Sequence, residues 1–358
     1  MSVRKENKSN KSKNKYNRLG DLGKVKKQTL ETIKKFIEMK RTFLLICTIL
    51  CANVLMAQEQ LATLKHNDSI RVYYGADAFK QAYNAAVNGD VITLSDGIFN
   101  TTDVRKGITL RGNGACGDTS RNARGTYFLD NFYVKGLGDS LQFSAEGIYF
   151  QSFTASNTGA DASYNTKFTK CHMISCSGYG IQAVNCVMEG YSGSSSHINI
   201  YANCVLNKFP SNSTCNNCIM KGSYTGSSSE HHAYNNCIVI NTSTSGTHSL
   251  RGAVLDCILI GRFSNTSPAS SRNVTMSISD VFENWDGNTI STDLETYVLK
   301  SSVSDTIVGF DGSEVGIFGG LMPFEKWTPT YSVIKRCNVS NRTTADGKLS
   351  VDIEVVTE

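Results

Sequence analysis

A short hydrophobic phrase recurs through the middle of the chain, between about residues 171 and 260. Each copy has an Asn or Asp (Lys in the first copy), then a Cys, then two or three apolar residues. The six cysteines are separated by steps of 15, 18, 14, 19 and 20 residues. Steps this short and irregular favour one short strand per repeat. Because such units cannot bury a hydrophobic face alone, we expect them to stack as a solenoid.

Stacking brings equivalent residues about 4.8 Å apart, so like residues form columns. Cys behaves as a small buried hydrophobe, and Asn tolerates the left-handed backbone of a tight bend. We therefore predict an interior column of free thiols, with each Asn at a bend and its amide bonded to the backbone or to the Asn of the next coil. The residues of this structural ladder are Cys171, Cys186, Cys204, Cys218, Cys237, Cys257, Asn185, Asn203, Asn217 and Asn236.

The alternative role for these cysteines is metal binding or redox chemistry. Cys215 and Cys218 form the nearest thing to a CxxC pair, but Cys218 already belongs to the ladder. A second CxxC or an HxxxH that would complete a zinc site does not occur in the sequence. The prediction is therefore that the protein uses no metal and no cofactor.

A longer repeat of 32 to 33 residues spans two copies of the phrase. In it a Gly/Ser run, which is typical of a loop, leads into a His and Tyr segment just before the Cys. We expect a partly exposed strip of Tyr and His along one face of the solenoid. The candidate ligand-binding residues are Tyr179, His197, Tyr201, His231, His232, Tyr234, His248 and Arg251.

The N-terminal part of the solenoid has its own pattern. Phe79, Tyr83, Ala86 and Val87 recur at helical spacing, which predicts a short amphipathic helix. The segments NGDVITLSDGIF and KGITLRGNG then predict strands joined by turns. Residues 77–114 together resemble the N-terminal cap and first coils of right-handed parallel β-helix proteins of the pectin-lyase-like superfold. The resemblance implies a helix that covers the open end of the solenoid, which would otherwise be a raw sheet edge.

The C-terminal part predicts an end to the solenoid and a hairpin. The glycine-rich stretch 309–320 is similar to the way many secreted Bacteroidetes β-helix proteins close their helix, and we expect it to form a last coil. Segments 332–339 and 348–356 alternate with period two around an Asp-Gly turn, which predicts a β-hairpin packed on the solenoid. The expected fold is all-β, a right-handed parallel β-helix over residues 70–322 with an N-terminal capping helix and a C-terminal β-hairpin over 323–358.

Charge is unevenly divided along the chain. Residues 1–41 carry a net charge of +10 and the remainder −5, so the total of +5 hides a mildly acidic folded part. That part has no basic face with interleaved aromatic residues, which argues against a nucleic-acid partner.

The N-terminal segment has the pattern of an export signal. Residues 1–38 form a polar, basic extension that is expected to be disordered. Lys40 and Arg41, an apolar run over 43–56 and Ala57 then follow the pattern of a signal peptide over 39–57, too short for a comfortable membrane span. We predict a protein that is secreted or at the cell surface, with the periplasm as another destination and no membrane span in the mature chain. Two alternatives stay open: a true start at Met39, or a signal anchor.

The superfold resemblance implies polysaccharide-cleaving enzymes, so an active site is the first thing to look for. Hydrolysis needs paired carboxyl groups, and a calcium-dependent lyase needs clustered carboxylates. The acidic residues between 161 and 260 lie repeats apart: Asp161, Glu189, Glu230 and Asp256. A calcium-free lyase with His as base and Tyr as acid stays open, as does an ordinary surface. We expect a non-catalytic module that binds a glycan or another cell-surface polymer, with a polysaccharide lyase or hydrolase of atypical site as the alternative.

Overall fold

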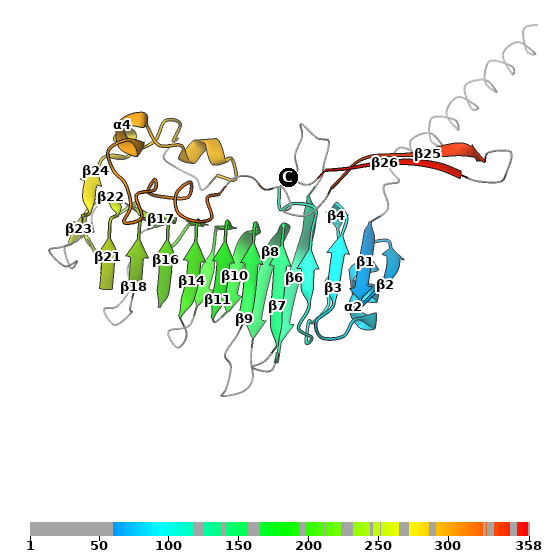
Figure 1. Ribbon diagram of the computed structural model, residues 1–358. Helices are drawn as coiled ribbons and strands as arrows, with labels where there is room; N and C mark the ends of the chain where they lie inside the picture. The colour runs from blue at the N-terminus through cyan, green and yellow to red at the C-terminus, as the bar shows by residue number, and fades with distance from the viewer. Residues whose placement is uncertain are drawn as a thin grey trace, which may run out of the picture. The chain divides into compact units, whose positions relative to one another are not determined.

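The computed structural model describes residues 60–116, 125–137, 141–156, 165–178, 180–193, 198–210, 212–222, 232–243, 246–250, 252–264, 272–285, 291–324, 327, 333–343 and 349–356. These residues form a right-handed parallel β-helix of about seven turns (Figure 1). The predicted all-β solenoid is therefore confirmed. The extension over 1–38 and the segment over 39–57 lie outside the described residues.

The first of two long sheets has eleven strands, and nearly every strand pairs in parallel with the equivalent strand of the next coil. Its strands, in spatial order, are β2 (Ser69–Tyr74), β1 (Leu61–His66), β3 (Val91–Leu94), β5 (Thr109–Arg111), β7 (Gln142–Glu146), β9 (Asn165–Thr169), β11 (Ile181–Val184), β14 (Asn199–Ala202), β16 (Ser213–Asn216), β18 (His232–Asn235) and β21 (Gly252–Leu255). Only β1 is antiparallel to its neighbours β2 and β3.

In each coil the chain passes from a strand of the first sheet, through a corner, into a strand of the second sheet. Its main path is β24 (Val274–Met276), β22 (Ile258–Ile260), β19 (Ile238–Asn241), β17 (Ile219–Gly222), β15 (Val205–Leu206), β12 (Val187–Met188), β10 (His172–Gly178), β8 (Ile148–Ser156), β6 (Thr126–Lys135) and β4 (Gly97–Ile98). β13 (Tyr191–Gly193) also pairs with β10, and β20 (His248–Ser249) pairs with β23 (Phe263–Ser264).

A helix closes the N-terminal end of the solenoid, as the sequence predicts. Helix α2 (Ala78–Ala85) buries Phe79, whose ring lies 5.1 Å from that of Phe128 and 5.7 Å from that of Phe132. The helix therefore packs on the aromatic interior of the first coils (Figure 1). The first sheet begins earlier than residue 70, because the hairpin of β1 and β2 adds two strands before the helix.

The recurrent Asn-Cys phrase forms the corner between the two sheets. The residue before each ladder cysteine has a positive φ of 50° to 54°. Such a backbone is costly for most side chains but accessible to Asn and Asp, which explains their recurrence. The residues at these corners are Lys170, Asn185, Asn203, Asn217, Asn236 and Asp256.

The apolar residues after each cysteine alternate between two hydrophobic clusters. In the third copy Cys204 and Leu206 face the interior of the solenoid, whereas Val205 belongs to a cluster on the outer face of the second sheet. This outer cluster is covered by the chain after β24, through Val281, Phe282, Tyr297, Leu299, Val303, Val315, Ile317 and Phe324. A sheet buried on both faces needs consecutive apolar residues, which is the pattern of the phrase.

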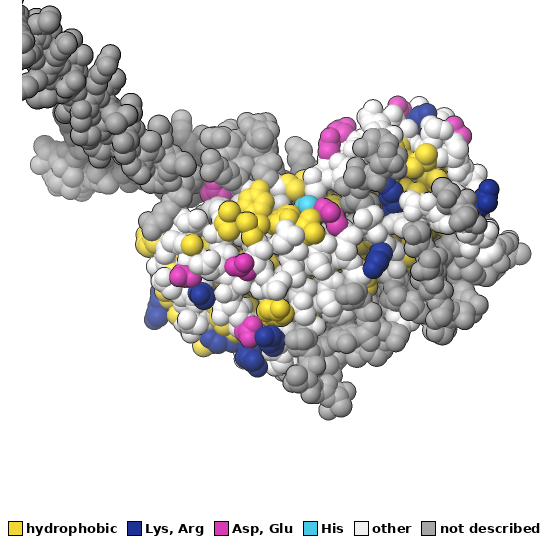
Figure 2. All heavy atoms as spheres, turned by 180° about the vertical axis from the view of Figure 1, so that it is seen from behind, with side chains coloured by type: hydrophobic (Ala, Val, Ile, Leu, Met, Phe, Trp, Pro, Cys, Tyr) yellow, Lys and Arg dark blue, Asp and Glu magenta, His cyan; other side chains and the backbone are white. Residues whose placement is uncertain are grey.

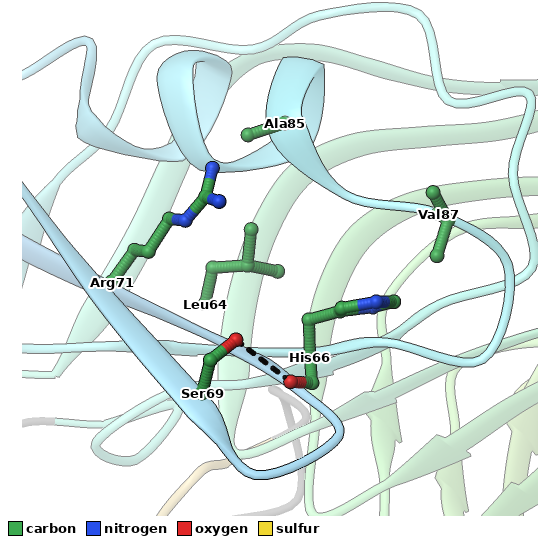
Figure 3. A pocket seen from close by; sticks show the side chains of 6 residues that line it. All are labelled: Leu64, His66, Ser69, Arg71, Ala85 and Val87. Atoms are coloured by element: carbon green, nitrogen blue, oxygen red, sulfur yellow. Dashed lines mark hydrogen bonds between the residues drawn. The ribbon is translucent and has the colours of Figure 1, made fainter.

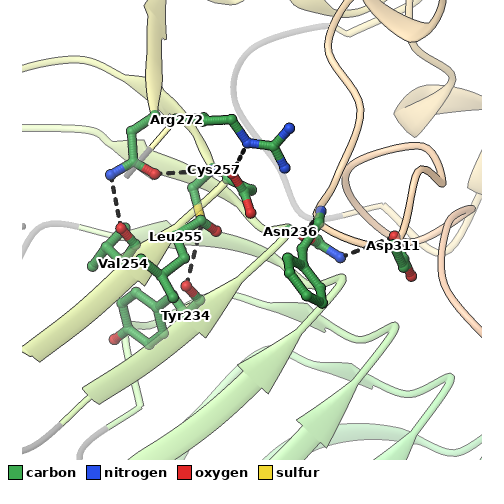
Figure 4. A network of polar contacts seen from close by, with 10 residues as sticks. Tyr234, Asn236, Val254, Leu255, Cys257, Arg272 and Asp311 are labelled. Atoms are coloured by element: carbon green, nitrogen blue, oxygen red, sulfur yellow. Dashed lines mark hydrogen bonds and ion pairs between the residues drawn. The ribbon is translucent and has the colours of Figure 1, made fainter. Parts of the chain in front are cut away.

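The glycine-rich stretch 309–320 is not the last coil that we expected. It is a strap that lies along the Asn corners of three coils. Asn236 donates from Nδ2 to Asp311 Oδ1 (3.3 Å; Figure 4), and Asn217 donates to the carbonyl of Glu314 (3.2 Å). Asn203 donates to the carbonyls of Ile317 (2.9 Å) and Gly319 (2.7 Å). The corner amides that could have bonded to each other are thus used to hold the strap.

The segments on either side of the strap are short elements and a hairpin. Before it come α3 (Ile278–Val281), the 3₁₀ helix η2 (Leu294–Tyr297) and α4 (Ser301–Ser304). After it, β25 (Val333–Thr343) pairs antiparallel with β26 (Leu349–Val356), which agrees with the predicted hairpin. Within the described part of the chain, none of the helices has both the length and the apolar character needed to cross a bilayer.

Candidate functional site

The six ladder cysteines form a buried column with structural contacts. All are inside the solenoid as free thiols. The Sγ of Cys204 accepts a hydrogen bond from the backbone N–H of Cys186 (3.5 Å), and the Sγ of Cys257 accepts one from Cys237 (3.3 Å). Burial raises the pKa of the Cys237 and Cys257 thiols. Thiols with a raised pKa are poor nucleophiles and poor metal ligands. Because all six ladder cysteines are buried, the column has no place in a site open to solvent.

Two members of the expected Tyr and His strip are in the core. Tyr201 and Tyr234 are fully buried, so the expectation that they lie on a partly exposed face is wrong. They belong to a column in which Tyr201 pairs in register with Ala183 and Cys215, and Cys215 pairs with Tyr234. Their rings fill the interior, and neither can stack against a sugar.

The structure says less about the other members of that strip. Tyr179, His197, His231 and Arg251 lie outside the described residues. His232 and His248 are described by their backbones alone, on β18 of the first sheet and on β20 beside β23. A binding role for these six residues stays a prediction.

The described histidine and aromatic residues converge elsewhere, on the outer face of the second sheet. Tyr127 of β6, Tyr149 of β8 and His172 of β10 occupy equivalent positions of three successive coils. Glu189, which follows β12, lies beside His172. We call Tyr127, Tyr149, His172 and Glu189 the tyrosine–histidine patch. Hydrophobic side chains gather beside histidine and acidic side chains on the face seen in Figure 2.

Ring contacts and one short hydrogen bond organise this patch. The Tyr127 and Tyr149 rings lie 5.5 Å apart and tilted, and the Tyr149 ring meets His172 edge to face at 5.1 Å. His172 Nε2 lies 2.9 Å from Glu189 Oε1. Because a carboxylate only accepts, Nε2 carries the proton of this bond. The Tyr149 hydroxyl donates to Gln151 Oε1 at 2.9 Å, so its direction is also set.

Burial separates the roles of His172 and Glu189. The His172 side chain is 8% exposed and that of Glu189 38%. Burial lowers the pKa of His172, while the bond to Glu189 raises it. Burial also raises the pKa of Tyr149, and the Glu189 charge adds to that effect. His172 is thus a neutral, enclosed support, and the groups that a ligand can reach are the Tyr rings and the carboxylate.

The chain beyond the strap borders the patch. The Trp327 ring lies 6.2 Å from that of His172 and 5.1 Å from that of Phe324, and its indole N–H donates to the Thr292 carbonyl at 2.8 Å. The patch is thus flanked on one side by a rigid indole. Trp327 lies 200 positions after Tyr127 in the sequence, so the fold brings distant segments together here.

Sequence reasoning missed this patch although every part of it was visible. In the sequence, His172 follows the Cys of the first, degenerate copy of the phrase, and Glu189 stands repeats away from the next acidic residue. Tyr127 and Tyr149 each precede a Phe that is buried in the core. The usable signal is that an aromatic or His side chain takes the outward position where later copies have Val or Ile.

The described residues also form a shallow pocket under the cap. It has a volume of about 210 Å³ and is lined by Leu64, His66, Ser69, Arg71, Ala85 and Val87 (Figure 3). His66 Nδ1 contacts the buried Asp90 carboxylate at 2.7 Å, which joins β1 to the turn after the helix. The His66–Asp90 contact supports the cap, and Arg71 is a further charged side chain that lines the pocket.

Neither the described residues nor the comparisons with known proteins identify a metal site or a family for this chain. Within the described ranges, no three His, Cys, Asp or Glu side chains lie in an arrangement that could hold a metal ion. A scan against protein-family models and a search of curated proteins both return no match for this chain.

Proposed function

We propose that this protein is exported and binds a glycan or another cell-surface polymer through the tyrosine–histidine patch. The observation that carries the proposal is the row of Tyr127, Tyr149 and His172 on three successive coils, with Glu189 held at its end. Sugar sites combine aromatic faces with a few oriented polar groups. The patch offers both on one rigid sheet, which limits the entropy lost on binding.

The repeat spacing of the solenoid also suits a polymer. Neighbouring coils place Tyr127 and Tyr149 one strand spacing apart, so a chain molecule laid along the axis meets several side chains in sequence. The segment 39–57 supports export by its pattern alone. Export to the outside or to the cell surface, and a polymer as the ligand, are both parts of this proposal.

A second candidate function is a polysaccharide lyase at the same patch. The observation that favours it is the edge-to-face contact of Tyr149 and His172 at 5.1 Å, which brings an acid and a base together. Against it, Nε2 of His172 already contacts Glu189, and the ring is almost enclosed. A base must reach its proton, so binding without cleavage is the better-supported function.

The test separates the two functions in one experiment. The purified full chain is mixed with neutral and uronate-containing soluble polysaccharides, and each mixture is run by size-exclusion chromatography. We expect one class of polysaccharide to co-elute with the protein at unchanged length. Shortened polysaccharide would favour the lyase, and the absence of any co-elution across the panel would contradict the proposal.

Variants then test the location of the site. Tyr127→Ala with Tyr149→Ala should weaken binding by about 10-fold or more, since each stacked aromatic contributes about 0.5 to 1.5 kcal/mol beyond its area. Glu189→Gln should weaken it less. The matched control is Tyr133→Ala, a half-buried tyrosine of the same strand β6 that pairs with Thr154 outside the patch. An equal loss of polysaccharide binding in Tyr133→Ala would mean that the polymer binds to another face of the protein.

A further inference from the structure

The first sheet ends at a strand whose outer edge is unpaired. Strand β2 is the terminal strand of that sheet and pairs with β1. Across the part of the chain that the structure describes, no strand pairs with β2 on its other side. Helix α2 covers the interior of the solenoid next to this strand but does not pair with its backbone (Figure 1). The edge is therefore a template for a further strand.

Hydrogen-bond alternation shows which backbone groups face that edge. Gly75 donates to the Gln60 carbonyl at 2.8 Å, and the Leu61 carbonyl accepts from Ser95 on the side of β3. Since residues of an antiparallel pair alternate between bonded and non-bonded positions, Ile70, Val72 and Tyr74 direct their N–H and C=O groups away from β1. Three donors and three acceptors thus point outward from one short strand.

The same three residues have exposed apolar side chains. Ile70 is 67% exposed, Val72 43% and Tyr74 57%. They share the outer face of the sheet, because Leu64 and Ala62 of the inner face pair with Arg71 and Tyr73. Figure 3 shows Arg71 on that inner side, next to Leu64 and Ala85 of helix α2. Strand edges in monomers are usually protected by Lys, Pro, a bulge or an inward-pointing charge. Between Ser69 and Tyr74 the one such feature is Arg71, and the outer face is left apolar.

We infer that the occupant of this edge is β2 of a second copy, in a two-fold antiparallel pair that joins the first sheets of two solenoids. The strand is self-complementary in one register. With Val72 opposite Val72 of the other copy, Ile70 lies opposite Tyr74 and all three outward-directed residues pair. About six hydrogen bonds form between the copies. An aromatic side chain opposite a β-branched one is a favourable cross-strand pair.

Charge selects this register over its neighbour. Arg71 is the only charged residue of β2. The register shifted by one step would place Arg71 opposite Arg71, and like charges directly opposite are unfavourable. The Val72-centred register instead places Arg71 opposite Tyr73, where a guanidinium can lie on an aromatic face. A two-fold axis normal to the sheet keeps the same face outward in both copies, so the exposed apolar side chains of the two strands form one continuous patch.

The test is the mass of the full chain in solution by sedimentation equilibrium. The wild-type protein is expected to be a dimer that dissociates on dilution. Val72→Lys should weaken the dimer at least 10-fold, because it sets two positive charges opposite each other. The matched control is Ile200→Lys, since Ile200 is also 43% exposed on the outer face of the first sheet but lies coils away on β14. Circular dichroism verifies that both variants fold.

Cross-linking tests the register. Val72→Cys should give a disulfide-linked dimer on mild oxidation, since two Cα atoms in a bonded antiparallel pair lie about 5.5 Å apart. Ile70→Cys should not, because Ile70 faces Tyr74. The wild-type chain is oxidised in parallel to account for its own thiols. A monomer at all concentrations, a Val72→Lys dimer as stable as wild type, or cross-linking at position 70 instead of 72 would each overturn the inference.

Discussion

At the scale of single residues, the corner asparagines combine two functions in one side chain. Each has a positive φ that turns the chain from the first sheet to the second. Three of them, Asn203, Asn217 and Asn236, also donate hydrogen bonds to residues 311–319. A glycine could make the turn, but it could not hold the strap. The residue type is thus selected by both demands at once.

Substitution of Asn203 separates the two functions. Asn203→Gly keeps the backbone accessible but removes the bonds to Ile317 and Gly319, and should lower the free energy of unfolding by about 1 to 3 kcal/mol. Asn203→Ala should lower it by roughly 1 kcal/mol more, because Ala is strained at φ 50°. Urea unfolding measures both values.

The control for this pair is Asn185→Gly. Asn185 has the same conformation, with φ 54°, but its side-chain oxygen accepts no hydrogen bond from the described residues. We expect a smaller loss than for Asn203→Gly. If Asn203→Gly and Asn203→Ala were equally stable, the backbone argument would be wrong.

At the scale of elements, the strap is the part that organises the outside of the solenoid. Its Val315 and Ile317 cover the outer cluster that includes Ile219 and Ile238, while its backbone accepts bonds from the corners. Gly316 donates to the Asn236 carbonyl at 2.9 Å with a φ of 91°. The strap is thus held by side chains on one side and by backbone on the other, and it leads to Trp327 at the tyrosine–histidine patch.

Gly316→Ala should loosen the strap. A Cβ at this position would lie 2.9 Å from Cδ1 of Ile238, in addition to the strain of a positive φ. Overpacking of this kind costs about 1 to 3 kcal/mol. The control is Gly312→Ala, which has a φ of 78° but no atom within 4 Å of the new Cβ.

Limited proteolysis reports the difference between these variants. We expect cleavage within 309–320 to be faster in Gly316→Ala than in Gly312→Ala, with the solenoid fragment intact in both. Equal cleavage rates would mean that the contact with Ile238 does not hold the strap in place.

At the scale of the whole molecule, the interior changes character along the axis. The coils next to the cap are filled by phenylalanine rings, such as Phe132 and Phe153 with centroids 5.9 Å apart. The later coils are filled by thiols, methionines and the buried Tyr201 and Tyr234. Because each coil contacts mainly its neighbours, stability is close to a sum over coils and their interfaces. A property shared by many coils therefore affects the stability of the whole.

The buried thiols are such a property, and they predict a loss of stability in alkali. Burial raises the pKa of Cys176 to about 12, whereas an unfolded Cys has a pKa of about 8.5. Between these values the folded chain keeps a proton that the unfolded chain loses. The free energy of unfolding should therefore fall as pH rises above about 8.5, by about 1.4 kcal/mol per pH unit for each such thiol.

Urea unfolding between pH 8 and 10.5, under reducing conditions, measures this slope. Cys176→Ala is the control. It should be less stable than the wild type at pH 8, but its free energy of unfolding should fall less steeply with pH, by about 1.4 kcal/mol per pH unit. A slope that does not change in the variant, or stability that is flat over this range, would contradict the assignment of Cys176 as a buried neutral thiol.

Much of the fold could be predicted because its signals are local. Helix α2, the strands around Asp90 and the C-terminal hairpin follow from spacing within about a dozen residues. The Asn at each corner followed from its tolerance of left-handed backbone. The site could not be predicted in this way, because Tyr201 and Tyr234 look the same in sequence whether they face inward or outward. A strand shifted by one residue exchanges its two faces, and only the register between coils decides which face is buried.

The pattern of residues along the chain is enough to predict that it stacks short parallel strands, caps them with a helix and turns each coil at an Asn-Cys corner. Each of these features depends on the conformational preferences of residues close together in the chain. Three features appear only in the folded chain. The segment 309–320 returns as a strap, Tyr149, His172 and Trp327 meet on one face, and no strand among the described residues pairs with the outer edge of β2. The strap and the position of Trp327 depend on contacts between residues 75 and 155 positions apart, and the edge of β2 depends on the absence of a described neighbour. Neither leaves a local pattern in the sequence.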